Sequence, residues 1–264
     1  MSYETLLIDK KAGIGIISLN RPDQFNTFTA TLAKELNTAL LEMDNDEEIN
    51  VVIIKGEGKA FSTGIDVSEL EGRDPAEYYP LISLMNKMNS TIASMNKPVI
   101  ASIHGYAVAN GAGLLAAADF AIAAEGTRIG TTAINVGLLC SGPVVPLSYC
   151  LSKKKALEML LTGDMIDAGE AERLGLVNRV VPLDKLEEAT ISFAGRLMSK
   201  SPAALRMGKK FYYEMMDMPF NGKLNLASEV FARLCTTDEA QADVKAFLDQ
   251  RKALEEKKQR RSKK

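Results

Sequence analysis

The stretch from His104 to Asp119, His-Gly-Tyr-Ala-Val-Ala-Asn-Gly-Ala-Gly-Leu-Leu-Ala-Ala-Ala-Asp, decides the fold of this chain. The apolar run at 99–103 comes directly before it, follows Pro98, and is typical of a buried strand. Small residues then dominate, and residues 114–118 are good helix formers. The stretch therefore predicts a strand, a glycine-rich turn and a helix.

The predicted turn has two interpretations. The first N–H groups of a helix have no partners within the helix, and the helix dipole favours negative charge there. Gly111 and Gly113 carry no Cβ, so a ligand can approach the backbone closely. The turn either binds a phosphate or the oxygen of an activated carbonyl, or it only packs a helix against a sheet.

Composition is typical of a globular protein. The 264 residues are 46% hydrophobic and 25% charged, enough for one large core with an appendage or for two small domains. A net charge of -2 gives no reason to expect nucleic acid as a partner. We see no signal-peptide pattern and no apolar run as long as a membrane span, so we expect a cytoplasmic protein that does not bind membranes.

The single histidine, His104, excludes several kinds of site. A zinc site built on several histidines is impossible, and a nucleophile–His–acid triad would need His104 itself. We interpret this histidine as a structural residue, and we expect no metal. The cysteines, Cys140, Cys150 and Cys235, are odd in number and widely spaced, which favours free thiols in a reducing compartment.

Strands and helices alternate up to about residue 180, which predicts an α/β core. The expected strands lie at 15–19, 51–55, 99–103, 120–123 and 177–181. Capping residues predict helix starts at Thr29, at Asp74 with Glu77, at Ser152, and at Asp167 with Glu170.

Beyond residue 180 the sequence predicts only helices, at 183–199, 202–216, 221–234 and 239–257. We therefore divide the chain into a core at 1–180 and a helical region at 181–264. The helical region has more apolar positions than one small layer needs, which indicates a subunit interface.

A second glycine turn, Ser62-Thr63-Gly64-Ile65-Asp66, follows the strand at 51–55. If it meets the turn at 109–113, one backbone N–H from each turn can donate to the same oxygen. Two such donors make an oxyanion hole, which stabilises an enolate or a tetrahedral intermediate.

Motifs from about residue 5 to about 254 resemble the crotonase family, which comprises the enoyl-CoA hydratases, isomerases and their relatives. They are Asn20-Arg21-Pro22 with Asn26, residues 59–66, residues 104–119, residues 160–164, Ala168, Ala171, Gly175-Leu176-Val177, Phe247 and Arg251. The resemblance implies an α/β fold, a spiral of ββα units with a C-terminal helical trimerisation region, and assembly as a homotrimer or hexamer.

The resemblance also implies an acyl-CoA thioester as substrate, with coenzyme A as part of the substrate and no other cofactor. The backbone N–H groups of Ile65 and Asn110 would form the oxyanion hole. Phe247 would approach the CoA of a neighbouring subunit. The positions expected to contact substrate or CoA are Gln24, Phe25, Ser62, Thr63, Gly64, Ile65, Asp66, Gly111, Ala133, Ser141 and Phe247.

The chain departs from the family where relatives hold an acid. Gly113 and Ala133 replace the two hydratase glutamates, and Ser141 replaces the aspartate of dienoyl isomerases and dehalogenases. The two glutamates place water and move protons, so hydration by the usual route is not expected. Asn110 also replaces a glycine at the second N–H donor, although Asn tolerates unusual φ values.

Few groups can replace these acids. We interpret Asp66 as fixing its own turn through backbone N–H groups. The Cys140 thiol has no nearby cation to lower its pKa and is expected to form an apolar wall. The other polar candidates are Glu69, Glu71, Tyr78, Tyr79 and Asn135.

Three functions stay open at this point. The first is an enzyme acting on acyl-CoA, a lyase or isomerase. The second is a crotonase-fold protein that binds acyl-CoA with little or no catalysis. The third is a dinucleotide-binding dehydrogenase, because residues 111–116 fit the glycine fingerprint, but Glu125 comes too early to serve as its acid.

Overall fold

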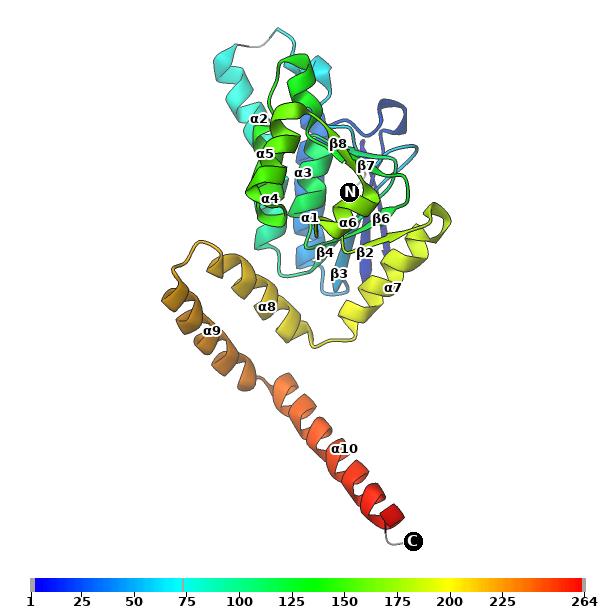
Figure 1. Cartoon of the computed structure of the whole chain (residues 1–264), viewed down its shortest axis with the longest axis vertical. Coiled ribbons are helices and arrows are strands. Elements are labelled where there is room, and N and C mark those ends of the chain that lie inside the picture. The colour runs from blue at the N-terminus through cyan, green and yellow to red at the C-terminus, as the bar shows by residue number, and fades with distance from the viewer. Residues whose placement is uncertain (1–2, 73, 263–264) are drawn as a thin grey trace. The chain divides into compact units, whose positions relative to one another are not determined.

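A computed structural model of the chain describes residues 3–72 and 74–262 (Figure 1). The chain divides into two compact units, Met1–Met198 and Ser199–Lys264. The first is a mixed α/β unit that contains both glycine turns, and the second is helical. The predicted α/β class is confirmed.

A six-stranded sheet forms the centre of the first unit. Its strands in spatial order are β1 (Leu6–Lys11), β2 (Ile14–Leu19), β3 (Val51–Gly56), β4 (Val99–Ile103), β6 (Phe120–Ala124) and β9 (Arg179–Val181). β1 and β2 pair antiparallel, and the later neighbours pair parallel. Parallel strands end at the same edge of a sheet, so the segments after β3 and β4 meet there.

Helices cover both faces of this sheet. In β3, Val52 and Ile54 enter a core with residues of α1 (Ala30–Asn45) and α2 (Pro75–Ser94). Val51 and Ile53 enter a second core with residues of α7 (Leu186–Met198). Burial on both faces explains why the strands are continuous apolar runs in the sequence.

Shorter elements complete the first unit. A second sheet, which the sequence did not predict, contains β5 (Tyr106–Val108), β7 (Arg128–Gly130) and β8 (Met165–Asp167). The remaining helices are α3 (Asn110–Ala117), α4 (Ser141–Cys150), α5 (Lys153–Thr162) and α6 (Ala168–Arg173). The 3₁₀ turns are η1 (Pro22–Gln24), η2 (Val67–Leu70), η3 (Thr132–Val136) and η4 (Leu183–Lys185).

The helix-start signals are confirmed. Asp74 and Glu77 form the capping box of α2, with each side chain bonded to the other residue's backbone N–H. Thr29, Ser152 and Asp167 cap α1, α5 and α6 through their side-chain oxygens. These starts were predictable because capping is decided by residues only three positions apart.

The observed division differs from the one predicted at residue 180. α7 lies beyond that residue, but Leu186 and Ala194 are buried in the core on the sheet. α7 is therefore part of the first unit. The helical pattern of the sequence gives the element and its length, but not the surface on which it packs.

The second unit contains α8 (Pro202–Met215), α9 (Phe220–Cys235) and α10 (Asp238–Ser262), close to the predicted ranges. Phe220, Phe231 and Phe247 are 73%, 68% and 64% exposed. Over the described ranges, we find no helix with the length and apolarity needed to cross a membrane.

Candidate functional site

The two glycine turns meet through backbone hydrogen bonds. The segment after β3 runs parallel to β5, with Phe61 N–H donating to His104 O at 3.0 Å and Ser62 N–H donating to Tyr106 O at 3.0 Å. Val108 N–H returns a bond to Ser62 O at 2.9 Å. The condition that the sequence left open, that these turns lie together, is therefore met.

Glycine is required where the turns touch. Gly64 has φ 98°, and a Cβ placed on it would lie 2.6 Å from Ala109 Cβ and 3.6 Å from the backbone nitrogen of Asn110. A Cβ on Gly111 would lie 2.4 Å from Ser62 O. A side chain at either glycine would force the turns apart, because real Cβ contacts are not this short.

Each turn carries one backbone donor that the fold does not use. Phe28 N–H donates to Gly64 O and Asp66 N–H donates to Phe28 O, so the Ile65 N–H between them is left out of this pairing. Asn110 is the first residue of α3. Throughout the described parts of the chain, we find no acceptor for the N–H of Ile65 or Asn110. The two turns that touch therefore each carry a backbone donor without a partner among the described residues.

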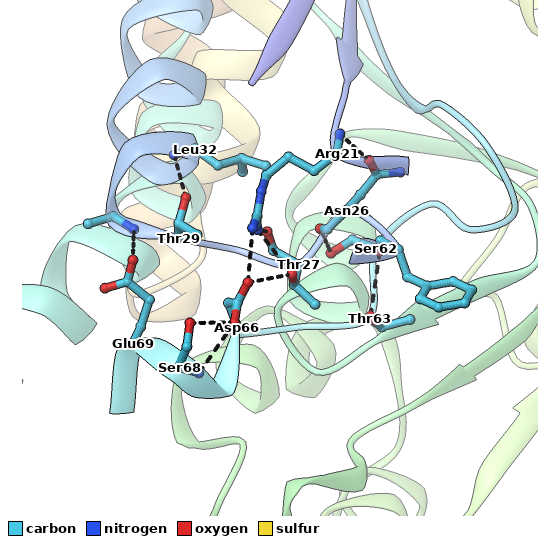
Figure 2. A network of polar contacts seen from close by, with 12 residues as sticks. Arg21, Asn26, Thr27, Thr29, Leu32, Ser62, Thr63, Asp66, Ser68 and Glu69 are labelled. Atoms are coloured by element: carbon cyan, nitrogen blue, oxygen red, sulfur yellow. Dashed lines mark hydrogen bonds and ion pairs between the residues drawn. The ribbon is translucent and has the colours of Figure 1, made fainter. Parts of the chain in front are cut away.

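An ion pair holds the first turn in place (Figure 2). Arg21 Nη2 lies 3.0 Å from Asp66 Oδ2, and Thr27 Oγ1 donates to the same oxygen at 3.1 Å. The Ser68 hydroxyl donates to Asp66 Oδ1 at 2.7 Å. The bonds from Ser68, followed by that from Arg21, outweigh burial and lower the pKa of Asp66 to about 2. An ionised, fully bonded carboxylate of this kind supports the turn and is a poor general base.

The Asn26 side chain supports the same segment through hydrogen bonds. Its side chain is fully buried and donates to Glu57 O at 2.9 Å and to Ala60 O at 2.8 Å, while its Oδ1 accepts from Arg21 N–H at 2.8 Å. The Ser62 hydroxyl donates to Asn26 O at 2.8 Å. Ser62, one of the predicted CoA contacts, is itself fully buried, so its side chain serves the turn.

Two of the other predicted CoA positions, Gln24 and Phe25, lie at the surface of the first unit. Gln24 ends η1 and is exposed, and Phe25 is 45% exposed. Thr63 N–H donates to Phe25 O at 3.2 Å, which brings these two residues together. Phe247 lies on α10 in the second unit.

The three positions at which relatives of the family hold an acid differ in their accessibility to solvent. Gly113 is buried in α3, and a Cβ on it would lie 2.9 Å from Pro143 Cα in α4. Ala133 is partly exposed in η3, and Ser141 is exposed at the start of α4. The space for a side chain at 113 is therefore occupied by the backbone of α4.

The candidate replacement groups have other partners or face solvent. Burial raises the pKa of the Cys140 thiol, which disfavours a nucleophilic thiolate. Glu69 Oε1 accepts from Ala30 N–H at 3.2 Å. The Tyr78 hydroxyl donates to Leu70 O at 2.5 Å. Glu71, Tyr79 and Asn135 are exposed.

The structural roles of Ala109 and Pro143 were not predicted from the sequence. Ala109 adopts φ 49° and ψ -114° directly before Asn110, a conformation that costs a residue with a Cβ about 1–3 kcal/mol. Its N–H donates to Gly130 O at 2.9 Å, so β7 holds it there. Neither residue type gives a sequence signal for its role, because both roles come from contacts between distant segments.

Comparison with known proteins agrees with this geometry. The family model for enoyl-CoA hydratase/isomerase matches residues 9–258. The chain belongs to this family, the crotonases. It is 35% identical over 254 residues to a probable enoyl-CoA hydratase of Rhizobium meliloti (strain 1021), covering 96% of this chain and 98% of the relative.

Solved structures show the same fold. An enoyl-CoA hydratase of Mycobacterium smegmatis superposes with a TM-score of 0.90 at 34% identity, covering 93% of this chain and 96% of that one. Human enoyl Coenzyme A hydratase domain-containing protein 3 gives a TM-score of 0.90 at 32% identity, covering 94% and 98%. The predicted crotonase fold is confirmed, and membership of the family sets aside the dehydrogenase interpretation.

The Asp66 ion pair predicts a pH-dependent contribution to stability. The folded-state pKa of about 2 lies below the ordinary value, so the contribution is complete above about pH 4 and is lost as the pH falls towards 2. We expect Asp66→Asn to lower the free energy of unfolding by about 1–2 kcal/mol at pH 7. Urea unfolding at pH 7 and pH 3 should show the deficit shrinking at the lower pH, with exposed Asp23→Asn as the control. A deficit independent of pH contradicts this account.

The contact between Gly113 and Pro143 predicts opposite effects for two helical glycines. Gly113→Ala should destabilise the chain by about 1–2 kcal/mol, because overpacking outweighs the gain in helix propensity. Gly195→Ala in α7 should stabilise it by up to about 1 kcal/mol, because a Cβ there meets no atom within 4 Å. Thermal unfolding of both variants makes the comparison. Stabilisation by Gly113→Ala would show that α4 does not press on α3.

Proposed function

We propose that this crotonase binds acyl-CoA thioesters and polarises the thioester carbonyl with the N–H groups of Ile65 and Asn110. The observation that carries the proposal is the contact of the two turns, each with one unpaired donor. The two donors are fixed before the substrate arrives, so no reorganisation is needed as charge develops on oxygen. One donor of this kind typically contributes about 3–4 kcal/mol to transition-state stabilisation.

The chemistry proposed for this site is stabilisation of a thioester enolate. A polarised carbonyl makes the α-carbon more acidic, which supports a lyase or isomerase reaction. Hydration through two glutamates is not part of the proposal, because Gly113 and Ala133 carry no carboxyl and α4 occupies the space at 113. A substrate group, or a group of the Asp66–Tyr79 segment that moves on binding, would have to supply the base.

A second candidate is a protein that binds acyl-CoA with little or no turnover. Two observations favour it. The Asp66 carboxylate is ionised and accepts bonds from Arg21, Thr27 and Ser68, and burial disfavours the Cys140 thiolate. The polarising turns then act as a carbonyl-binding device without a proton-transfer group.

For the coenzyme, we propose contacts with the surface formed by Gln24, Phe25 and Thr63. Phe25 is 45% exposed, so the face of its aromatic ring is open to offset stacking with an adenine. The substrate would approach the backbone closely at Gly64, Asp66 and Gly111. Ala133 and Ser141 would form the wall around the acyl chain. No further cofactor is proposed.

We propose a homotrimer or hexamer in the cytoplasm. The exposed Phe220, Phe231 and Phe247 on α9 and α10 support assembly, because isolated helices rarely expose so many aromatic rings. Phe247 would reach the CoA of a neighbouring subunit. The three free cysteines are consistent with a reducing compartment. Sedimentation at micromolar concentration should give a trimer or larger species, and a monomer would count against the assembly.

The proposal is tested by binding and turnover with the same substrate. We expect crotonyl-CoA to bind more tightly than crotonate, and its hydration to run at least about 10²-fold below that of a family hydratase with both glutamates. Gly64→Ala should weaken polarisation and any turnover, because its Cβ meets Ala109. Gly126→Ala is the matched control, since Gly126 also has positive φ but no neighbour within 4 Å.

Two results separate the candidates or contradict both. Binding of crotonyl-CoA and of a 3-enoyl-CoA without conversion of either supports the non-catalytic candidate. Equal affinity for crotonyl-CoA and crotonate, or an unchanged Gly64→Ala variant, contradicts the proposed site.

A further inference from the structure

A cavity lies on the face of the large sheet that α7 covers. Its volume is about 410 Å³, it is partly open to solvent, and its lining includes no residue of either glycine turn. Ile16 and Ile53 of the sheet and Leu186 and Ile191 of α7 form apolar walls. A cavity of this size is in the range of small-molecule sites.

Polar side chains gather in this cavity because three parallel strands end beside one another. Ser18 of β2 pairs in register with Lys55 of β3, and Lys55 pairs with Ser102 of β4. All three line the cavity, together with Glu57 and His104. The carboxyl ends of neighbouring parallel strands are where ligands bind in open α/β sheets.

Glu57 is held as a carboxylate in this group. Its Oε1 lies 3.0 Å from Lys55 Nζ. Burial raises the pKa of Glu57, but hydrogen bonds from Lys55 and Ser18 outweigh burial and lower it. The carboxylate therefore keeps its charge at neutral pH, with further lone pairs on both oxygens.

The other polar groups of the cavity are held by hydrogen bonds. His104 Nε2 lies 2.9 Å from Gly58 O, and a carbonyl only accepts, so Nε2 carries a proton. The Thr190 hydroxyl donates to Leu186 O at 2.7 Å. The Ser102 hydroxyl, 3.1 Å away, then donates to Thr190 and keeps only lone pairs for a ligand.

The lining residues also carry a net negative charge, which likewise favours a hydrogen-bond donor as the ligand. Asp9, Glu57 and Glu187 contribute three carboxylates, and Lys55 is the single cation among the lining residues. Because Lys55 already faces Glu57, a ligand carboxylate would compete for an occupied partner and would meet the uncompensated acids. A cationic hydrogen-bond donor meets neither obstacle.

We propose that this cavity binds a small organic amine in its ammonium form. The ammonium head donates to Glu57, and the hydrocarbon body lies against Ile16 and Ile53. Each added methylene should tighten binding about fourfold until the apolar walls are filled. The inference is independent of the acyl-CoA proposal, because it uses the opposite face of the sheet.

The test is titration of the full-length protein with n-hexylammonium, hexanoate and hexanol. His104 is the only histidine, so its ring signals in NMR report on the cavity without assignment of other residues. We expect n-hexylammonium to shift these signals with a Kd of about 1 mM or tighter. Hexanoate and hexanol should bind at least about tenfold more weakly.

Two variants test whether electrostatic attraction drives amine binding, and they should change the affinity in opposite directions. Glu57→Gln should weaken n-hexylammonium binding at least about tenfold, and Lys55→Met should tighten it. Glu125→Gln, at an exposed position outside the lining, is the control and should change nothing. Lys55→Met keeps the test decisive if Glu57→Gln fails to fold. Unshifted His104 signals, binding of hexanoate as tight as that of the amine, or weaker amine binding by Lys55→Met overturns the proposal.

Discussion

The close approach of Gly64 to Ala109 is the constraint on which the rest of the structure depends. It places two unpaired N–H groups on adjacent turns, and it leaves no room for a Cβ on Gly64. Each partner is held from its own side. The Arg21–Asp66 pair fixes the first turn, and the bond from Ala109 to Gly130 fixes the second. The strained φ of Ala109 persists because β5 and β7 together over-determine it.

Sequence patterns were sufficient where structure is decided locally. The capping box at Asp74 and Glu77 and the apolar runs of β3 and β4 each depend on a few neighbouring residues. The two glycine turns and the family motif likewise identified the segments of the candidate site. These features can be predicted without knowledge of tertiary contacts.

Long-range contacts account for what the sequence could not show. The three strands of the small sheet have three residues each, too few for a hydrophobic period. The sequence predicted that Gly113 allows a ligand to approach the backbone and that it lacks an acid, whereas its contact with Pro143 also removes the space for an acidic side chain. The interpretation of His104 as structural agrees with its bond to Gly58, yet His104 also lines a cavity that no local pattern reveals.

The central claim is that the two turns polarise a thioester carbonyl. Isotope-edited infrared spectroscopy of butyryl-CoA, labelled with ¹³C at the thioester carbonyl, measures this directly, because a saturated acyl chain cannot be hydrated. The account predicts that the C=O stretch of the bound ligand falls below that of the free ligand. It also predicts that the shift is lost in Gly64→Ala and kept in Gly126→Ala. A tightly bound ligand with an unshifted carbonyl would contradict it.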